Sequence, residues 1–378
     1  MNARAPGTLG SCAGWALGPM EAAVRIVVTG ASGNVGSALL RRLVGSGRHD
    51  VLGIARRIPD AVAPFDAVDW RSIDLTDSAA TGELVQAFEG ADAVVHLAWG
   101  FQPSHDLAFL EELGVGGTRR VLDAVAGADV PHLVHMSSVG AYSPKQDDEP
   151  VGETWPTGGV PSSPYSRHKA TAERLLDSHE QAHPGRLVTR LRPGIVGQRS
   201  AGSALLRYAV PGVVPARVIG HVPVLPLDRR LTIPMVHSDD VADAVERVVE
   251  GRVPGPFNLA ADPPVTTAAI AGVLGARLVH VPAPVLRVAL TLAWKARVEQ
   301  LDPGWLDLGF AVPLMDTSKA SVELGWVAKV NALSVLEEVV SGMRDSASDA
   351  TPVLRPRSVQ SQVLGALKDG PVSYRREP

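Results

Sequence analysis

The chain has 378 residues, and 36 Lys and Arg against 40 Asp and Glu give a formal net charge of −4, so neither a nucleic-acid nor a membrane partner is expected. Its single cysteine, Cys12, excludes an intrachain disulfide and a cysteine-based zinc or iron–sulfur site, and it favours a reducing cytoplasm. No uncharged apolar run reaches the roughly 18 residues of a membrane span.

Residues 1–22 are rich in Gly, Ala and Pro and have no apolar periodicity. A secretory signal needs an apolar segment of about 7–15 residues, and the stretch between Arg4 and Leu9 is far shorter. We predict a disordered N-terminal extension over residues 1–22. A true start at Met20 is the alternative.

From Val24 onward, short β-branched segments alternate with segments of helical periodicity. The predicted strands are Val24–Val28, Val51–Ala55, Ala93–Leu97, Leu133–Met136 and Leu187–Leu191, and the predicted helices cover about 35–44, 79–88, 107–126 and 165–182. Strands joined through helices imply right-handed crossovers and a parallel sheet of the α/β class. Because ligands of such sheets lie beyond the carboxyl ends of the strands, the residues after each strand are the candidates for chemistry.

The first strand is followed by TGASGNVG at 29–36, a G-x-x-G-x-x-G pattern between a strand and a helix. The glycines permit a tight turn and close approach of the backbone to a pyrophosphate, and the helix N-terminus adds N–H groups and a favourable dipole. We therefore predict a dinucleotide site in a Rossmann-type doubly wound sheet. The cofactor-binding residues predicted in this turn are Gly30, Ser32, Gly33, Asn34, Val35 and Gly36.

The end of the second strand bears on which dinucleotide binds. Where a NAD site commonly has an acidic residue for the ribose 2′-hydroxyl, this chain has Arg56 and Arg57. Two guanidinium groups suit a 2′-phosphate, so NADP is favoured and NAD is the alternative. The alternative is that both arginines are solvated beyond the end of the strand and bind no ligand. Asp74 and Leu75 follow a short third strand, where Asp74 either contacts the adenine amino group or caps the next helix.

The predicted strand Leu133–Met136 is followed by Ser137 and Ser138, and Tyr165 and Lys169 come later on one face of a predicted helix. A free tyrosine has a pKa near 10 and is a poor base at neutral pH. A lysine cation and an oxidised nicotinamide ring nearby would favour tyrosinate and bring Tyr165 into working range. Ser138 would then hydrogen-bond the substrate oxygen. The alternative for the Tyr–Lys pair is a chance pair on a helix surface.

Taken together, these motifs resemble the extended short-chain dehydrogenase/reductase superfamily, also described as the NAD-dependent epimerase/dehydratase family. The resemblance covers about residues 24–330. Its segments are TGASGNVG (29–36), VVHLAW (94–99), GTRRVLDA (117–124), HMSSVGAY (135–142), SPYSRHK (163–169), RPGIVG (192–197), HSDDVADA (237–244) and LMDTSKASVELGW (314–326).

The resemblance implies roles for further residues. Leu97 and Ala98 would line the cofactor, and Pro193 and Val196 would pack beside the nicotinamide. Ser138, Tyr165 and Lys169 would form the catalytic set. Ser137 is the competitor for the serine role, and the family's usual pairing of subunits through two helices implies a homodimer.

Three departures from the family pattern favour an NADP-linked reductase or dehydrogenase over a nucleotide-sugar epimerase. Gly114 stands where the family usually has Asn in an N-V-x-G-T stretch, and the segment RPGIVGQ at 192–198 lacks the Asn of the R-x-x-N-V-Y-G form that is common among nucleotide-sugar enzymes. The third is the arginine pair Arg56–Arg57, which replaces the acidic residue typical of epimerases that retain NAD strongly.

We assign residues 23–200 to the nucleotide-binding domain, with parts of 230–262 returning to it, residues 201–343 mainly to a smaller substrate-binding portion, and residues 344–378 to a disordered tail. The apolar, Pro-rich loops 210–215 and 222–227 either wall the pocket or act as rigid connectors. The apolar helix 285–294 is expected in the core or at a dimer contact rather than in a membrane. The arginines that could grip a diphosphate are Arg199, Arg207, Arg217, Arg229 and Arg230.

A metal site is rejected, because His132 and His135 are three apart on a strand and point to opposite faces. The leading hypothesis is an NAD(P)-dependent oxidoreductase that moves a hydride at a secondary alcohol or ketone carbon of a small molecule, with Tyr165 as the acid/base. The alternatives are a nucleotide-sugar epimerase or dehydratase with tightly bound NAD, and a non-catalytic nucleotide-binding protein on the same fold.

Overall fold

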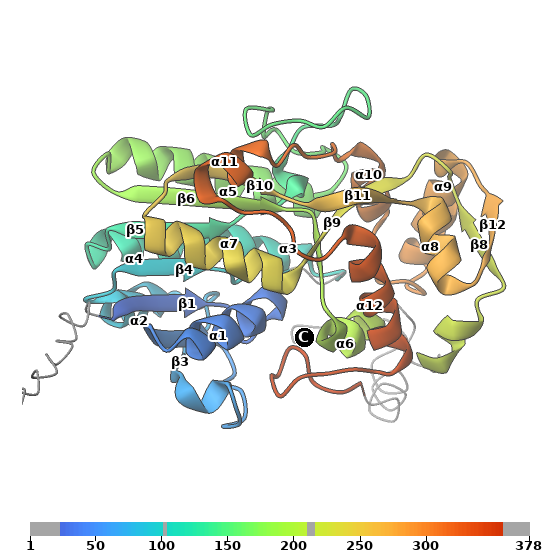
Figure 1. Ribbon diagram of the computed structural model, residues 1–378. Helices are drawn as coiled ribbons and strands as arrows, with labels where there is room; N and C mark the ends of the chain where they lie inside the picture. The colour runs from blue at the N-terminus through green and yellow to red at the C-terminus, as the bar shows by residue number, and fades with distance from the viewer. Residues whose placement is uncertain (1–22, 101–103, 210–215, 358–378) are drawn as a thin grey trace, which may run out of the picture.

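The structure is a computed structural model that describes residues 23–100, 104–209 and 216–357, so the predicted N-terminal extension lies outside the described residues. Its centre is a parallel seven-stranded sheet in the order β10-β6-β5-β4-β1-β2-β3 (Figure 1). The strands are β1 (Val24–Thr29), β2 (His49–Ala55), β3 (Asp69–Ser72), β4 (Ala93–His96), β5 (His132–Met136), β6 (Leu187–Pro193) and β10 (Gly255–Leu259). The predicted Rossmann-like α/β fold is therefore confirmed.

Helices cover both faces of this sheet. On one face α1 packs against α7, and on the other α4 packs against both α2 and α5. The bounds are α1 (Asn34–Ser46), α2 (Ala80–Phe88), α4 (Gly117–Gly127), α5 (Pro164–Ala182) and α7 (Ser238–Gly251). The side chains of β1 alternate between the two layers, because Val28 joins the α1–α7 core and Val27 joins the α2–α4 core.

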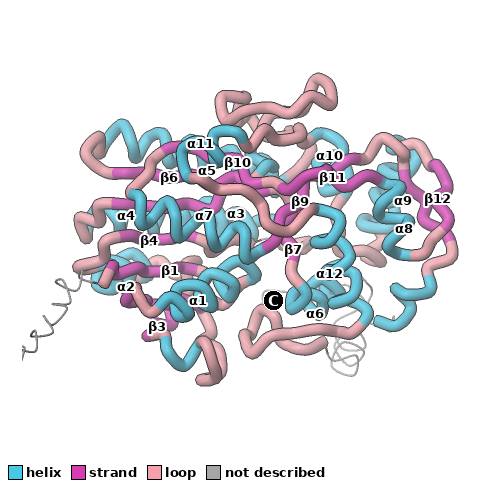
Figure 2. Tube along the Cα trace, viewed as in Figure 1, coloured by secondary structure: helices cyan, strands magenta, loops and turns pink. Residues whose placement is uncertain are grey.

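A smaller portion extends beyond the carboxyl ends of the sheet, toward the right of Figures 1 and 2. It contains a three-stranded sheet in the order β11-β9-β7 and a parallel pair of β12 and β8. The strands are β7 (Ile195–Gly197), β8 (Val224–Leu227), β9 (Thr232–His237), β11 (Ala261–Thr266) and β12 (Arg277–His280). The helices are α6 (Gly202–Ala209), α8 (Thr267–Leu274), α9 (Ala283–Lys295), α10 (Pro303–Ala311), α11 (Ser318–Leu324) and α12 (Ala332–Arg344). Of this set α11 stands apart, because it contacts β10 and α7 of the larger portion.

Three sequence expectations differ from the structure. The predicted helix 107–126 is divided into α3 (Leu107–Glu111), a π-helical turn (Glu112–Gly116) and α4. The predicted disordered tail begins too early, because Thr351 and Leu354 are each only 1% exposed; residues 358–378 lie outside the described residues. The apolar helix expected in the core or at a dimer contact, α9, contains no buried residue and so does not belong to the core of the described chain.

The sequence pattern missed these features because it reports local periodicity and composition, whereas burial of a short Pro-rich segment depends on distant partners. Among the helices of the described ranges, none combines the length and the apolarity that a membrane crossing requires.

Candidate active site

A cavity of about 530 Å³ lies at the carboxyl ends of the central strands, where the sheet topology predicts a ligand. Every residue that the sequence proposes for the cofactor or for catalysis lines it. These residues are Gly30, Ser32, Gly33, Asn34, Val35, Gly36, Arg56, Arg57, Asp74, Leu75, Leu97, Ala98, Ser138, Tyr165, Lys169, Pro193 and Val196.

The glycine-rich turn has the shape that a pyrophosphate requires. Gly30 has φ +72°, and a Cβ there would come within 2.5 Å of the Ala98 nitrogen, so no larger residue fits. Gly33 precedes α1 and provides no side-chain cap, and Gly33 and the first residues of the helix, Asn34, Val35 and Gly36, all line the cavity. A Cβ on Gly36 would come within 2.5 Å of the Gly30 carbonyl oxygen. These features fit the dinucleotide that the motif predicts.

Asn34 has a structural role in this turn. Its Nδ2 donates to the Val196 carbonyl at 3.1 Å, and Gln198 Nε2 donates to Asn34 Oδ1 at 2.8 Å and to its carbonyl at 2.7 Å. The turn is thereby tied to β7, which lies at the other side of the cavity. Asn34 lines the cavity, but its amide is already engaged by the protein.

Arg56 and Arg57 line the cavity where β2 ends. Asp74 lies beside them, and its Oδ1 accepts from the backbone nitrogen of Thr76 at 2.9 Å and from the Thr76 hydroxyl at 2.8 Å. Asp74 therefore stabilises a turn before α2 and does not cap that helix, which begins at Ala80 without a side-chain cap. The arginines lie at the adenosine end predicted for the 2′-phosphate.

Ser138 and Tyr165 lie together beyond β5. The Ser138 hydroxyl oxygen accepts from the Gly140 nitrogen at 3.0 Å. Burial raises the pKa of Tyr165 to about 12, and a side-chain hydrogen bond with Ser138 opposes the rise. A Cβ on Gly140 would come within 2.9 Å of the Tyr165 ring, so a glycine there permits the phenol to lie close to the end of β5.

Lys169 is almost completely buried, and its Nζ donates to the Met136 carbonyl at 2.8 Å. The same Nζ lies 3.5 Å from the centre of the Trp99 ring. Burial lowers the pKa of Lys169 to about 7, and the charge of Glu173 opposes that shift. We expected Lys169 to depress the pKa of Tyr165; in this chain burial dominates the pKa of both groups.

Ser137 faces a different set of partners. Its hydroxyl donates to Glu173 Oε1 at 2.6 Å. Glu173 also pairs with Arg192, whose Nε lies 2.8 Å from Oε1, and with Arg190, whose Nη1 lies 3.0 Å from Oε2. Because Ser137 is held by this buried network, the geometry favours Ser138 for the serine role.

One departure from the family pattern has a steric explanation. A Cβ on Gly114 would come within 3.0 Å of the Trp99 ring, so the indole occupies the space beside the position of the usual Asn. A side chain at position 114 would therefore push against this ring. At the second departure, the Asn position of the R-x-x-N-V-Y-G form is occupied by Ile195, which begins β7 and lines the cavity.

Sequence reasoning missed three aromatic residues that line the cavity, Trp99, Phe109 and Trp305, of which the two tryptophans contact the candidate catalytic residues. Trp99 follows β4, so its position after a strand could have marked it, and its ring centre lies 6.4 Å from that of Tyr165. Trp305 of α10 lies 4.9 Å from the Tyr165 ring, and no local pattern marked it. Residues 352–354, assigned to the disordered tail, also line the cavity.

The arginines considered for a diphosphate do not reach the cavity where the structure describes them. Arg199 pairs with Asp345, and Arg230 pairs with Asp228. Arg207 donates to two carbonyls of residues 353 and 355. Arg229 does not line the cavity, and the Arg217 side chain and loop 210–215 lie outside the described residues. Residues 222–227 form β8 and its approach rather than a cavity wall.

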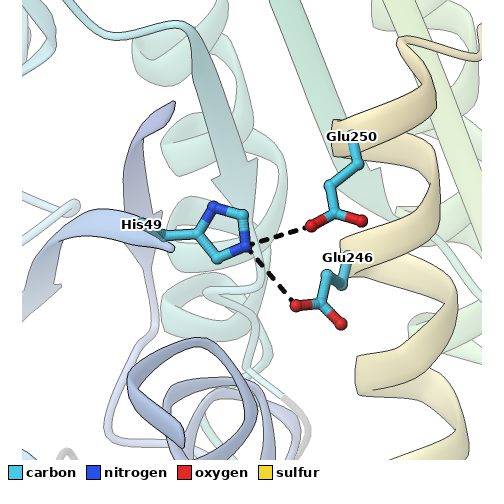
Figure 3. A group of neighbouring side chains, drawn as sticks. All are labelled: His49, Glu246 and Glu250. Carbon is cyan, nitrogen blue, oxygen red and sulfur yellow. Dashed lines mark hydrogen bonds and ion pairs between the residues drawn. The ribbon is translucent and has the colours of Figure 1, made fainter. Parts of the chain in front are cut away.

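Figure 3 shows His49, Glu246 and Glu250, whose ligand atoms all lie within 4.8 Å of one another. His49 is the first residue of β2, so this group lies at the amino end of that strand, whereas the cavity lies at the carboxyl ends of the strands. Arg48 pairs with both carboxylates at 3.1 and 2.8 Å, and Arg42 also pairs with Glu246. With this countercharge in place, we interpret the group as an ion-pair cluster that joins α1, β2 and α7.

Comparison with known proteins identifies a matching family and several relatives. The profile of the NAD dependent epimerase/dehydratase family matches residues 26–260. An uncharacterized protein of Mycobacterium tuberculosis is 29% identical over 326 residues, which are 85% of this chain and 30% of that protein. The L-arabinose 1-dehydrogenase (NAD(P)+) of Haloferax volcanii is 34% identical over 182 residues, 45% of this chain and 66% of the relative.

Among solved structures, the UDP-glucose 4-epimerase of Thermus thermophilus in complex with NAD has a TM-score of 0.62 at 22% identity. The match covers 85% of this chain and 99% of that chain. The likeness confirms the fold. This chain spans about 30% of the length of the mycobacterial relatives that it matches.

Proposed function

The chain belongs to the NAD-dependent epimerase/dehydratase family, a family of enzymes, and we propose that it is an NAD(P)-dependent oxidoreductase acting on a secondary alcohol or ketone. The observation that carries this proposal is that Ser138, Tyr165 and Lys169 line the same cavity as the glycine-rich turn. A non-catalytic nucleotide-binding protein has no need for a buried Tyr–Lys pair beside that turn.

A nicotinamide cofactor held by the glycine-rich turn and the cavity wall would supply the hydride donor or acceptor for the substrate carbon. The Ser138 hydroxyl hydrogen-bonds the substrate oxygen and fixes the carbonyl. In reduction, the Tyr165 phenol gives its proton to that oxygen, and solvent returns a proton to the phenolate. The high pKa of Tyr165 keeps the proton on the phenol until it is needed. In oxidation, the proton moves in the opposite direction.

Lys169 acts electrostatically on this proton transfer. A phenolate at Tyr165 would be a second charge in a buried site, and a charged Lys169 stabilises it. Because burial brings the pKa of Lys169 to about 7, its side chain changes between the charged ammonium and the neutral amine near neutral pH. The charge state of the pair therefore responds to a negative charge on Tyr165 or on a bound ligand.

We propose NADP as the preferred cofactor. The support is the position of Arg56 and Arg57 in the cavity wall where β2 ends, and Asp74, the neighbouring carboxylate, is engaged by Thr76. Two guanidinium groups there favour a 2′-phosphate over a 2′-hydroxyl. The Haloferax relative, which carries NAD(P)+ in its name, is consistent with either cofactor.

The proposed substrate is uncharged and largely apolar. Of the described residues that line the cavity, the cations are Arg56, Arg57 and Lys169, and the first two belong to the cofactor side. The substrate side is lined by aromatic and aliphatic side chains, among them Trp99, Leu205, Met235, Trp305, Leu308 and Val312. A nucleotide sugar would bring a diphosphate that these groups do not neutralise, which disfavours the epimerase alternative.

The test is turnover with NADPH and with NADH of two sets of compounds: uncharged aryl-alkyl ketones of increasing size, and UDP-sugars. The proposal expects consumption of NADPH with the ketones, and kcat/KM that rises with apolar size. Epimerised UDP-sugar without net consumption of cofactor would support the alternative and contradict the proposal.

A further inference from the structure

The outer face of α9 is an apolar surface that no described element covers. Val285, Val288 and Leu292 are spaced three and four apart on one side of the helix, and they are 57%, 60% and 64% exposed. Ala289 and Ala296 are exposed on the same side. We propose that this face docks the protein on an anionic lipid surface.

The charge of the surrounding segment supports a negatively charged partner. Between Asp262 and Glu299 the sequence contains no acidic residue, but it contains Arg277, Arg287, Lys295 and Arg297. Lys295 lies on the outer face of α9, while Arg297 follows the helix and is also exposed. Arg287 is paired with Asp307 of α10, so Arg277, Lys295 and Arg297 account for the positive charge of this segment, in contrast to the net charge of −4 of the whole chain.

An apolar stripe with basic residues at its end is the pattern of a helix that lies in a membrane interface. The apolar side chains enter the boundary of the acyl chains, and the cations remain among the headgroups. A second copy of this chain is the competing occupant of this face, and the experiment below separates it from a lipid surface. The opposite side of α9 is not part of the proposed docking surface, because Arg287 on that side pairs with Asp307 of α10 at 2.9 Å.

The elements next to α9 extend the proposed docking surface at the same end of the molecule. Figure 1 shows α9 beside α8 and the β8–β12 pair at the right-hand end of the molecule. Val224 of β8 is paired with Arg277 of β12, and Val279 follows two residues later; all three side chains are exposed. The end therefore combines further apolar side chains with another cation.

Docking at α9 would also place the lipid surface near the cavity. The α9 helix packs on α10, which supplies Trp305 and Leu308 to the cavity wall. The Trp294 ring stacks on His105 at 4.6 Å, next to the cavity-lining Ser104. The link to an apolar substrate rests on the proposed function, whereas the docking itself does not require any activity.

The experiment is flotation of the full chain with vesicles of phosphatidylcholine alone and of phosphatidylcholine with phosphatidylglycerol. The wild type should float with the anionic vesicles and should be released at high salt. Leu292→Asp should weaken this binding by about tenfold or more, because an exposed apolar side chain that would enter the lipid is replaced by a charge. Lys295→Glu should weaken it as well, because it reverses one charge at the surface.

The matched control is Val322→Asp on α11, which changes an 84% exposed valine away from α9 and should bind as the wild type does. Circular dichroism and gel filtration establish that each variant is folded; if Leu292→Asp does not fold, the exposed Lys295→Glu decides. Three results would overturn the proposal: no binding by the wild type, equal binding to neutral vesicles, or binding unaffected by both α9 variants. Conversion of a wild-type dimer to monomer by Leu292→Asp would assign the face to a second copy.

These outcomes are separable from the proposed reaction, because no step of the assay uses a cofactor or substrate. A protein that reduces ketones but does not float would overturn only the docking surface. A protein that floats but reduces no carbonyl would overturn only the proposed function.

Discussion

The indole ring of Trp99 lies between Gly114 and the Lys169 ammonium, at 3.5 Å from ring centre to Nζ. A side chain at position 114 and the indole would compete for the same space. The usual Asn of the family is thus replaced by a Gly–Trp pair in which the aromatic face contacts the lysine. This pair accounts for one of the departures noted in the sequence.

The first prediction concerns this packing. Gly114→Ala should lower the free energy of unfolding by about 1–3 kcal/mol, because the new Cβ would press on the Trp99 ring. Trp99→Leu in the same chain should recover part of the loss. Urea unfolding measures both. Gly82→Ala is the control, since its Cβ would meet no atom within 4 Å and should be neutral or stabilising. An equal effect at both glycines would refute the packing argument.

The second prediction is a pH dependence of stability that originates at Lys169, whose pKa falls from 10.5 in a free side chain to about 7 in the folded chain. Below about pH 7, Lys169 is protonated in both the folded and the unfolded chain, and the folded chain then buries a charge. Between the two values only the unfolded chain binds the proton, so stability rises with pH. Lys169→Met removes this cost and should exceed the wild type in stability near neutral and acid pH, with a gap that closes as the pH increases toward about 10.

The control for that experiment is Lys319→Met. Lys319 has the same two kinds of contact, because its Nζ donates to the Pro256 carbonyl at 2.7 Å and lies 4.1 Å from the centre of the Phe257 ring. Its side chain is 29% exposed, so its charge is not removed from water to the same degree. Urea unfolding of both variants at several pH values separates the effect of burying the charge from the effect of these contacts. A flat difference for Lys169→Met would contradict the burial argument.

Much of this account was accessible from the sequence because the informative residues are local. The glycine-rich turn, the strand ends and the Tyr–Lys spacing are each set by a few adjacent positions, and the structure brings all of them to one cavity. The parallel sheet follows from the alternation of strands and helices.

The rest depends on contacts between distant segments. Trp305 reaches Tyr165 from 140 positions further along the chain, and Leu354 is buried against α6, so no local pattern identifies them. The exposed face of α9 shows the converse, because an apolar helix was expected to be covered. Composition reports how apolar a segment is, and only the packing reports which of its faces is covered.

The third prediction concerns the cofactor. The wild type should bind NADPH at least tenfold more tightly than NADH, about 1.4 kcal/mol, and Arg56→Ala/Arg57→Ala should lose that preference. Nicotinamide fluorescence measures both affinities. Arg71→Ala is the control, because Arg71 is an exposed arginine of β3 that does not line the cavity. Equal binding of the two cofactors by the wild type would assign the arginine pair to the solvated surface.

The fourth prediction separates catalysis from stability. Tyr165→Phe should lower turnover by about 10²–10⁴-fold while the affinity for the cofactor is kept, because only the transferable proton is lost. Tyr142→Phe removes the same atom from another buried tyrosine, whose hydroxyl donates to Asn258 at 2.6 Å outside the cavity wall. It should cost about 1–3 kcal/mol of stability and leave turnover unchanged. Similar turnover in the two variants would remove Tyr165 from the reaction.

Transfer of deuterium tests the central claim most directly. Wild-type protein and Tyr165→Phe are incubated with an uncharged aryl-alkyl ketone and NADPH deuterated at the transferable position of the ring, and the alcohol is analysed by mass spectrometry. The account predicts that the wild type forms an alcohol with deuterium on its carbinol carbon and that Tyr165→Phe forms almost none. A wild type that labels no ketone but interconverts UDP-sugars without net consumption of cofactor would contradict it.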